Sequence, residues 1–324
     1  MARVRASALS LLLAVASLVG WASLVGWASP GAASPARRTS TPTPGYWLVG
    51  GDGGVFAFNA AFAGSGAPGA GSPGLCAFAF GPGIDVSAES LADAGGVVSR
   101  VNCVGIAGSE GNSGYWIANF PSLPAGFGTA AAPGQLGCTG LNGAEVGWTG
   151  IAATPSGRGF FLVSQNGGVL GCGDATPVGG VSELHLANQI VGIAGTADAR
   201  GNWLVGADGG VIAFGDAGYY GSMGGRPLNL PVVGIAATPD GGGYWLVGAD
   251  GGVFAFGDAA YYGSMSGHTL NEPVSGIAAD PDGSGYWLVA DDGGVFAFGG
   301  APFEGSMSGG HLDAPMVGIA ASAH

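Results

Sequence analysis

One short segment recurs along most of this chain, and the recurrence limits the folds that the chain can adopt. The segment reads close to Gly-Tyr-Trp-Leu-Val, and its last copies follow one another at intervals of 42 residues. Its second aromatic residue lies at six positions, Trp47, Trp116, Phe161, Trp203, Trp245 and Trp287. A second marker, Gly-Ile-Ala, also occurs six times, with its isoleucine at Ile106, Ile151, Ile193, Ile235, Ile277 and Ile319. The two markers predict six repeats.

Each repeat contains four segments typical of short strands, which in the clearest copy are 232–237, 244–247, 253–256 and 261–265. Asp-Gly pairs between them, such as Asp250-Gly251, favour tight hairpins. The third segment, Val-Phe-Ala-Phe, is apolar on both faces, so other sheets must cover both of its sides. Four antiparallel strands in each of six copies predict an all-β fold, a six-bladed β-propeller of four-stranded blades.

The two ends of the repeat array indicate how the predicted ring closes. The first repeat begins at Gly45 without a Gly-Ile-Ala strand, and the last such strand, 317–321, has no outer strands after it. We therefore expect the C-terminal strand to pair with the first blade. Such a pairing ties both ends into one sheet and removes open sheet edges.

The N-terminal part of the chain predicts export. Two arginines precede an apolar stretch and small residues follow it, so residues 1–36 are expected to be a signal peptide. A duplicated segment makes the stretch long enough to span a bilayer, and an uncleaved membrane anchor is the alternative. A membrane contact is expected only in that case. Residues 37–44 form a Thr/Pro linker, and residues 45–324 form the propeller, with an insertion at about 66–99.

The cysteines fit an exported protein. They show no Cys-x-x-Cys spacing of the kind found in zinc or redox sites, so two structural disulfides are expected among Cys76, Cys103, Cys138 and Cys172. Three pairings are open. One pairing joins Cys76 to Cys103 at the ends of the insertion and Cys138 to Cys172, a bridge that would pin two neighbouring blades.

Charge and composition restrict the partners. The net charge of −13 and the pI near 4.3 repel phosphate backbones, so no nucleic acid is expected to bind. An acidic chain can accumulate cations, and calcium is the one cofactor considered. The fragment Asp280-x-Asp282-Gly283 falls short of the six to eight oxygens that calcium takes, so no metal site is assigned.

The repeats resemble a known type. Residues 243–247, 250–259 and 262–264 read GYWLV, DGGVFAFGDA and YGS, and they resemble the glycine-rich repeats of exported proteins from high-GC Gram-positive bacteria. The resemblance implies a propeller and an envelope location, but no shared biochemical activity. A local resemblance to the Asp-box of sialidase-type propellers, which acts there as a hairpin brace, is carried by Thr238, Asp240, Gly242 and Trp245.

Polar residues concentrate on one predicted face, where two kinds of loop meet. In a four-stranded blade, the turn between strands two and three emerges beside the crossing to the next blade, and loops on a rigid scaffold commonly bind ligands. The candidate ligand-binding residues in the turns are Asp52, Asn166, Asp208, Asp250 and Asp292, and those in the crossings are His185, Arg226, His268, Asn271, His311 and Asp313. The aspartates also suit a hairpin before Gly-Gly for purely local reasons.

Catalysis is the less favoured interpretation. The arginines of the repeats do not converge as a sialidase cluster would, and no histidine lies near a Gly-x-Ser-x-Gly elbow, so no catalytic residue is assigned. The sequence predicts a secreted or cell-surface binding module for a polysaccharide, cell-wall or protein ligand. A secreted glycan-active hydrolase or lyase is the first alternative, and a purely structural repeat domain is the second.

Overall fold

The computed structural model describes residues 43–65, 103–119, 123–140, 147–182 and 186–322, which belong to one unit of the chain, 42–324. The predicted signal peptide, the predicted insertion and most of the Thr/Pro linker lie outside these residues. Within the described ranges, no helix has the length and the apolar composition that a membrane crossing requires.

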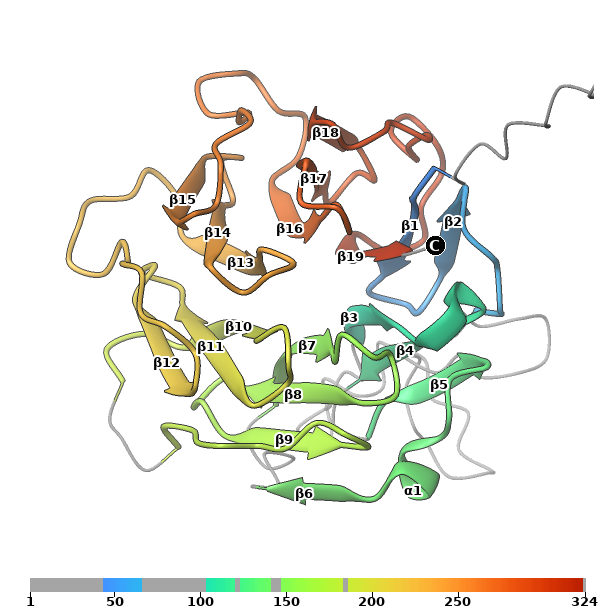
Figure 1. Cartoon of the computed structure of the whole chain (residues 1–324). Helices are drawn as coiled ribbons and strands as arrows, with labels where there is room; N and C mark the ends of the chain where they lie inside the picture. Colours follow the sequence, from blue (N-terminus) through green and yellow to red (C-terminus); the bar gives the residue numbers. More distant parts are fainter. Residues whose placement is uncertain (1–42, 66–102, 120–122, 141–146, 183–185, 323–324) are drawn as a thin grey trace, which may run out of the picture. The chain divides into compact units, whose positions relative to one another are not determined.

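The described residues form antiparallel sheets of three or four strands with very little helix, which confirms the all-β class (Figure 1). We number the six sheets of these residues by the order of their middle strands in the chain. Sheet 1 contains β19 (Met316–Ser322), β1 (Gly45–Gly50) and β2 (Val55–Phe58); sheet 2 contains β3 (Cys103–Gly108), β4 (Gly114–Asn119) and β5 (Ala125–Gly128); sheet 3 contains β7 (Trp148–Ala153), β8 (Phe160–Ser164), β9 (Val169–Cys172) and β6 (Cys138–Gly140).

The other three sheets have the same strand order. Sheet 4 contains β10 (Ile190–Gly195), β11 (Gly201–Gly206) and β12 (Val211–Gly215); sheet 5 contains β13 (Val232–Ala237), β14 (Gly243–Gly248) and β15 (Val253–Gly257); sheet 6 contains β16 (Val274–Ala279), β17 (Gly285–Ala290) and β18 (Val295–Gly299). A single helical turn, α1 (Pro133–Leu136), precedes β6, and a 3₁₀ turn (Glu110–Asn112) precedes β4.

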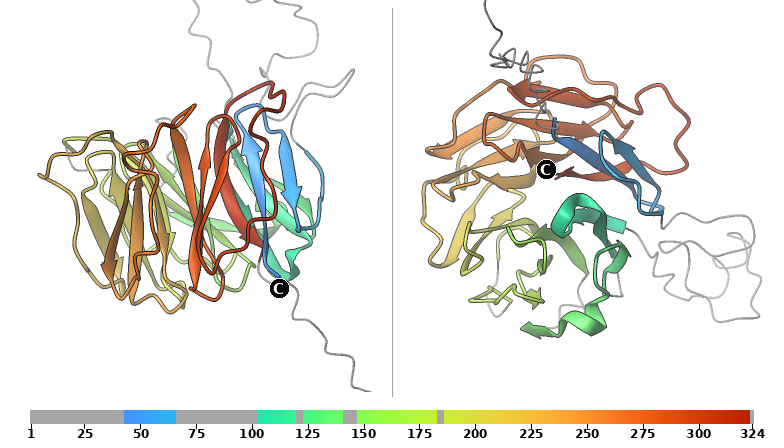
Figure 2. Two further views of the ribbon diagram at one scale, coloured as in Figure 1. Left: turned by 90° about the horizontal axis from the view of Figure 1, so that it is seen from above. Right: turned by 45° about the vertical axis from the view of Figure 1, so that its right-hand side comes forward.

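Sheet 5 is covered on both faces by its neighbours, as the apolar strands predicted. The middle strand β14 is buried over its whole length, and its Tyr244 and Trp245 are at most 1% exposed. Tyr244 packs on Trp203 of sheet 4 with ring centroids 5.6 Å apart, and Tyr286 packs on Trp245 with centroids 5.5 Å apart. Figure 2 shows neighbouring sheets side by side. The core therefore lies between the sheets, in a series of aromatic layers.

The first strand of each sheet lies innermost in Figure 1, and small residues allow these strands to approach one another. A Cβ atom on Gly150 of β7 would lie 3.2 Å from the Cα atom of Gly192 of β10. That distance is shorter than most Cβ contacts, so a side chain at Gly150 would push the two strands apart by a few tenths of an ångström. The glycine of the repeated Gly-Ile-Ala marker thus suits close packing between first strands.

A buried tyrosine hydroxyl links each of several sheets to the one before it. The Tyr286 hydroxyl donates to the Gly263 carbonyl oxygen at 2.5 Å and accepts the Tyr262 N–H at 3.2 Å. The Tyr244 hydroxyl bonds in the same way to residues 220 and 221, and the Tyr46 hydroxyl bonds to residues 304 and 305. Each tyrosine therefore satisfies backbone groups of the segment that follows the third strand of the preceding sheet.

This bonding explains why the prediction of four-stranded blades is wrong for most of the sheets. Residues 261–265 form no strand, because the Tyr262 N–H bonds to a side chain of sheet 6 and Gly263 has a φ of +136°, which interrupts the pleat. Only sheet 3 has four strands among the described residues, since β6 pairs with β9 there. The other five sheets have three strands each.

The two ends of the repeat array meet in sheet 1. β19 pairs antiparallel with β1, and Trp47 lies opposite Ala320. The Gly45 N–H also donates to the Ser322 hydroxyl at 3.0 Å. The first repeat thus receives its missing first strand from the C-terminal end of the described chain.

Candidate functional site

Loops of two kinds gather on one side of the sheets, which we call the crossing face. They are the turns between second and third strands, such as 249–252, and the crossings to the next sheet, such as 266–273. The Ala249 N–H donates to the Pro231 carbonyl oxygen at 2.9 Å, and the Ala249 carbonyl oxygen accepts the Val274 N–H at 3.0 Å. A turn of one sheet is therefore bonded both to the crossing before it and to the strand that follows the next crossing, so backbone hydrogen bonds join the loops of this face.

The predicted turn aspartates stabilise their own turns. Asp250 Oδ1 accepts the Gly252 N–H at 2.9 Å, and the same bond joins Asp208 to Gly210, Asp292 to Gly294 and Asp52 to Gly54. Asn166 occupies the position in sheet 3 with its own bond to Gly168. Turn chemistry thus accounts for one carboxylate oxygen. The second oxygen is directed elsewhere: Asp250 Oδ2 accepts the Asn229 amide at 3.2 Å.

Two equivalent clefts open on this face at successive sheet boundaries. Cleft A, between sheets 4 and 5, has a volume of about 370 Å³ and is lined in part by Asn229, Asp250, Ser264 and Tyr261. Cleft B, between sheets 5 and 6, has a volume of about 190 Å³ and is lined in part by Asn271, Asp292, Ser306 and Glu272. Each cleft therefore combines an amide, a carboxylate and hydroxyl groups with an apolar side chain, Phe254 or Phe296.

The structure brings some predicted residues together and leaves others apart. Asp250 lies in cleft A, and Asn271 and Asp292 lie in cleft B. Asn229, Ser264 and Ser306 were not among the residues predicted from the sequence. The 42-residue register could have found them, because Asn229 and Asn271 are one repeat apart, as are Ser264 and Ser306.

Among the described residues, the predicted basic side chains line neither of the two clefts. Arg226 and His268 are exposed at equivalent positions of successive crossings, and neither lines cleft A or cleft B. His311 Nε2 lies 3.3 Å from Asp313 Oδ1, and these side chains are 90% and 81% exposed. His185 lies outside the described residues. Asp208 lies in its turn in sheet 4 and takes no part in the two clefts.

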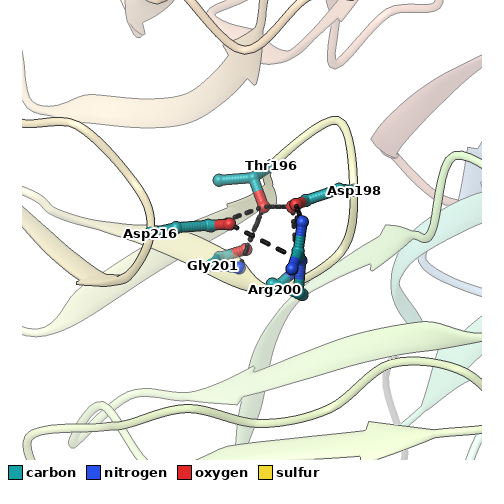
Figure 3. Close-up of polar contacts among 5 residues, drawn as sticks. All are labelled: Thr196, Asp198, Arg200, Gly201 and Asp216. Atoms are coloured by element: carbon teal, nitrogen blue, oxygen red, sulfur yellow. Dashed lines mark hydrogen bonds and ion pairs between the residues drawn. The ribbon is translucent and has the colours of Figure 1, made fainter.

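The opposite face carries a hairpin brace that recurs in three sheets. Figure 3 shows the copy in sheet 4. The Thr196 hydroxyl accepts the Gly201 N–H at 2.9 Å and lies 3.2 Å from Asp216 Oδ1. Arg200 Nη2 lies 2.6 Å from Asp198 Oδ2, and Arg200 Nε lies 3.9 Å from Asp216 Oδ2. Equivalent braces are built on Thr154 and Thr238, with Asp174 and Asp258. The Asp-box residues at 238–245 are thus part of a brace.

Electrostatics agree with a structural role for this brace. The Arg200 N–H and then the Thr196 hydroxyl lower the pKa of Asp198 to about 2, with a further contribution from the Arg200 guanidinium. Arg158 and Arg200 each pair with an acid of their own sheet, so they do not converge on a ligand. A third cleft of about 260 Å³ between sheets 5 and 6 is lined by Asp240, Asp258 and Asp282 on this face.

No three His, Cys, Asp or Glu side chains of the described residues are arranged to hold a metal ion. The aspartates of the third cleft are instead held by hairpin bonds, since Asp240 Oδ1 accepts the Gly242 N–H at 3.1 Å. No set of ligands for calcium can therefore be named within these ranges.

Comparison with known proteins identifies the fold. No family model matches this sequence, and no curated protein matches it. Among solved structures, a propeller chain from the crystal structure of a nidogen/laminin complex matches with a TM-score of 0.52 and 11% sequence identity, over 86% of this chain and 98% of that chain. The fold is a β-propeller. At this identity the propeller likeness establishes architecture and not function.

The propeller is reinforced by a disulfide between Cys138 and Cys172. These residues are opposite one another on β6 and β9, so the bond lies within sheet 3. The expected link between two blades is therefore corrected: β6 follows sheet 2 in the chain but pairs as the edge strand of sheet 3. Cys103 is also disulfide-bonded, and Cys76 lies outside the described residues.

Proposed function

We propose that the six sheets are the blades of a closed six-bladed propeller that acts as a binding module outside the cytoplasm. Contacts between the first strands support the ring: β16 packs against β19, β19 against β3, and β3 against β7. The Tyr46 hydroxyl of sheet 1 also bonds to the backbone of residues 304 and 305. These contacts join the last sheet to the first in the same way as the internal sheets are joined.

Two observations support an extracellular location. Disulfides persist in oxidising compartments, and the chain has the Cys138–Cys172 bond. Its N-terminal sequence has the pattern of an export signal. The propeller that resembles it belongs to a crystal structure of a nidogen/laminin complex, so a propeller of this shape can serve in an assembly.

The repetition of clefts A and B carries the proposed binding role. Equivalent amide, carboxylate and hydroxyl groups stand at two successive boundaries on a platform held by backbone hydrogen bonds. Only one oxygen of each turn aspartate is used by the turn itself. This arrangement suits an extended ligand that makes the same contact more than once. Such a ligand can be a polysaccharide, a cell-wall polymer or a protein.

A pull-down with the full chain tests this function. The chain is incubated with isolated cell walls, a panel of purified polysaccharides and defined extracellular proteins, and released sugars are assayed in the soluble fraction. The cleft variant combines Asn229→Ala, Asn271→Ala, Asp250→Asn and Asp292→Asn, because an asparagine keeps the turn bond, as Asn166 does. We expect retention of the chain on one ligand class and a loss of roughly tenfold or more in the variant.

The matched control changes the opposite face. Asp240→Asn with Asp282→Asn alters two carboxylates of the third cleft and is expected to bind as the unmodified chain does. A further variant, Arg226→Ala with His268→Ala and His311→Ala, tests the exposed basic residues of the crossings. Retention that depends only on the opposite face would contradict the assigned site, and release of soluble sugars would favour the hydrolase or lyase.

A further inference from the structure

Four large aromatic side chains stand in the solvent at equivalent positions of the repeat. Phe62, Tyr219, Tyr261 and Phe303 are 60%, 63%, 61% and 60% exposed. Each directly follows a residue whose carbonyl oxygen accepts the indole N–H of the tryptophan in the same sheet. Tyr261, for example, follows Ala260, which accepts the Trp245 N–H. We call them the aromatic row. They belong to sheets 4, 5, 6 and 1, whose first strands pack in that order.

Folding of the repeat does not require an aromatic residue at this position. Sheet 2 has Ala132 there, directly after the Ala131 carbonyl that accepts the Trp116 N–H, and sheet 3 has Pro177 at the same register. Both sheets form without the ring. A single exposed apolar side chain is ordinary, but recurrence at one exposed position of four consecutive sheets calls for a role other than folding.

The neighbouring tyrosines show the contrast between a structural ring and a member of the row. Tyr262 bonds through its hydroxyl to the Gly283 carbonyl oxygen at 2.8 Å and packs on Tyr286. Tyr261, one residue earlier, has its hydroxyl 3.1 Å from the Ser264 hydroxyl and leaves most of its ring in the solvent. Tyr261 and its equivalent Tyr219 therefore have a contact for their hydroxyl groups while their rings stay exposed.

The spacing and surroundings of the row restrict its partner. Packed sheets lie about 10 Å apart, so the rings are separated by at least that interval and form no continuous apolar patch of the kind at the core of a protein interface. Asp216, Asp258 and Glu304 lie within three residues of Tyr219, Tyr261 and Phe303, and they repel an anionic polymer. Sugar rings have apolar faces that stack on aromatic rings, and a polymer presents such faces at regular intervals.

We propose that the aromatic row binds an uncharged polysaccharide, whose sugars stack on successive rings along the outer side of sheets 4, 5, 6 and 1. This inference rests on the proposed binding function and names its ligand class. Tyr261 also lines cleft A, so one chain of sugars can contact the row and the hydrogen-bonding groups of that cleft together.

Affinity electrophoresis of the full chain tests the proposal. The gels contain hydroxyethyl cellulose, dextran, mannan, galactan or glycol chitin, and the polymer that retards the chain is compared with its carboxymethylated form. We expect retardation by at least one uncharged polymer and weaker retardation by the carboxymethylated one. Replacing one ring by alanine should weaken binding roughly tenfold, and replacing all four should abolish it.

Two further variants separate ring stacking from other effects. Tyr219→Phe with Tyr261→Phe keeps the rings and should bind within about twofold of the unmodified chain. Leu123→Ala with Val178→Ala removes apolar side chains that are 45% and 40% exposed but lie outside the row, and it should leave binding unchanged. Thermal unfolding of the four-alanine variant checks that it is folded, which we expect because sheets 2 and 3 form with Ala132 and Pro177 at this position.

The outcomes distinguish this inference from the proposed function. If the chain binds a ligand and only the cleft variant loses that binding, the binding function stands and the role proposed for the aromatic row is wrong. Three other results also overturn the proposed role of the aromatic row. They are equal retardation by the carboxymethylated polymer, retention of a protein alone, and no retardation by any uncharged polymer. If no polysaccharide, cell wall or protein is retained, both proposals fail.

Discussion

At the scale of single residues, Asp280 is the clearest departure from the repeat. Sheets 3, 4 and 5 have Thr154, Thr196 and Thr238 at this position, where the hydroxyl accepts a backbone N–H. Asp280 is 1% exposed; its Oδ2 accepts the Ser284 hydroxyl at 3.0 Å, and its Oδ1 is buried without a hydrogen-bond partner among the described residues. Burial raises the pKa of Asp280, and the nearby Asp282 charge adds to the rise. The carboxylate thus costs stability when ionised.

We predict that Asp280→Thr stabilises the fold by about 1 kcal/mol at pH 7. Below the ordinary pKa of 3.8 the Asp280 carboxyl is protonated in the folded and unfolded states, so the unmodified chain has its full stability there. The unfolded state ionises at a lower pH than the folded state, so ionisation favours unfolding. The unmodified chain therefore loses stability as the pH rises through the raised pKa of the folded state. Urea unfolding should therefore show a gain at pH 7 that shrinks toward pH 3.5.

The converse variant, Thr238→Asp, places the same carboxyl in sheet 5 and serves as the matched control. It should lower the free energy of unfolding at pH 7 and have a smaller effect at low pH. A gain for Asp280→Thr that does not change with pH would show that the ionised carboxylate is not the cause.

At the scale of elements, β6 is the only fourth strand among the described sheets, and a disulfide accompanies it. The strand is three residues long and two of them are exposed, so few apolar contacts hold it in place. Its pairing with β9 is joined covalently through Cys138 and Cys172, which are 34 residues apart in the chain. The covalent bond compensates for the weak packing of a short edge strand.

Replacing both cysteines, Cys138→Ala with Cys172→Ala, should lower the free energy of unfolding by about 2–4 kcal/mol, because the unfolded chain gains freedom across the loop. Urea unfolding measures the loss, and limited proteolysis should cut near β6 first. Thr139→Ala in the same strand is the control, with little expected effect. An unchanged unfolding midpoint in the double variant would mean that β6 is held by its hydrogen bonds alone.

At the scale of the whole molecule, the same kind of aromatic contact joins sheets that are far apart in sequence. Tyr46 of sheet 1 packs on Trp287 of sheet 6 with ring centroids 5.4 Å apart, much as Tyr286 packs on Trp245. The boundary between sheets 3 and 4 is different, because Phe161 stands at the tryptophan position and Asn202 at the tyrosine position. Asn202 is fully buried, and neither polar atom of its side chain has a partner in the described residues. We expect this boundary to be weaker than the others.

If the proposed ring is closed, ending the chain at Pro315 should abolish cooperative unfolding, since it removes β19 and with it buried Met316, Ile319 and Ala320. Circular dichroism against urea gives the measurement, and a synthetic peptide of residues 316–324 should restore part of the transition. Removal of only the last two residues is the control. A truncated chain that unfolds with the original midpoint would show that the first and last sheets do not depend on each other.

Sequence alone determined the features that depend on neighbours within one hairpin. The first three strands of the repeat, the turn aspartates and the need for cover on both faces follow from local pattern. The crossing face with Asp250, Asn271 and Asp292 follows from counting strand reversals. Tertiary structure decided what lies between sheets. The Tyr46 hydroxyl bonds to the backbone 259 residues away, in a segment where a fourth strand was predicted. Only the folded chain shows which side chains share a cleft. Arg226, His268 and His311 looked alike in sequence because they share a loop type, but they belong to separate crossings and none of them lines cleft A or cleft B. Local interactions repeat with the sequence and can be read from it, whereas contacts between sheets depend on how the sheets pack.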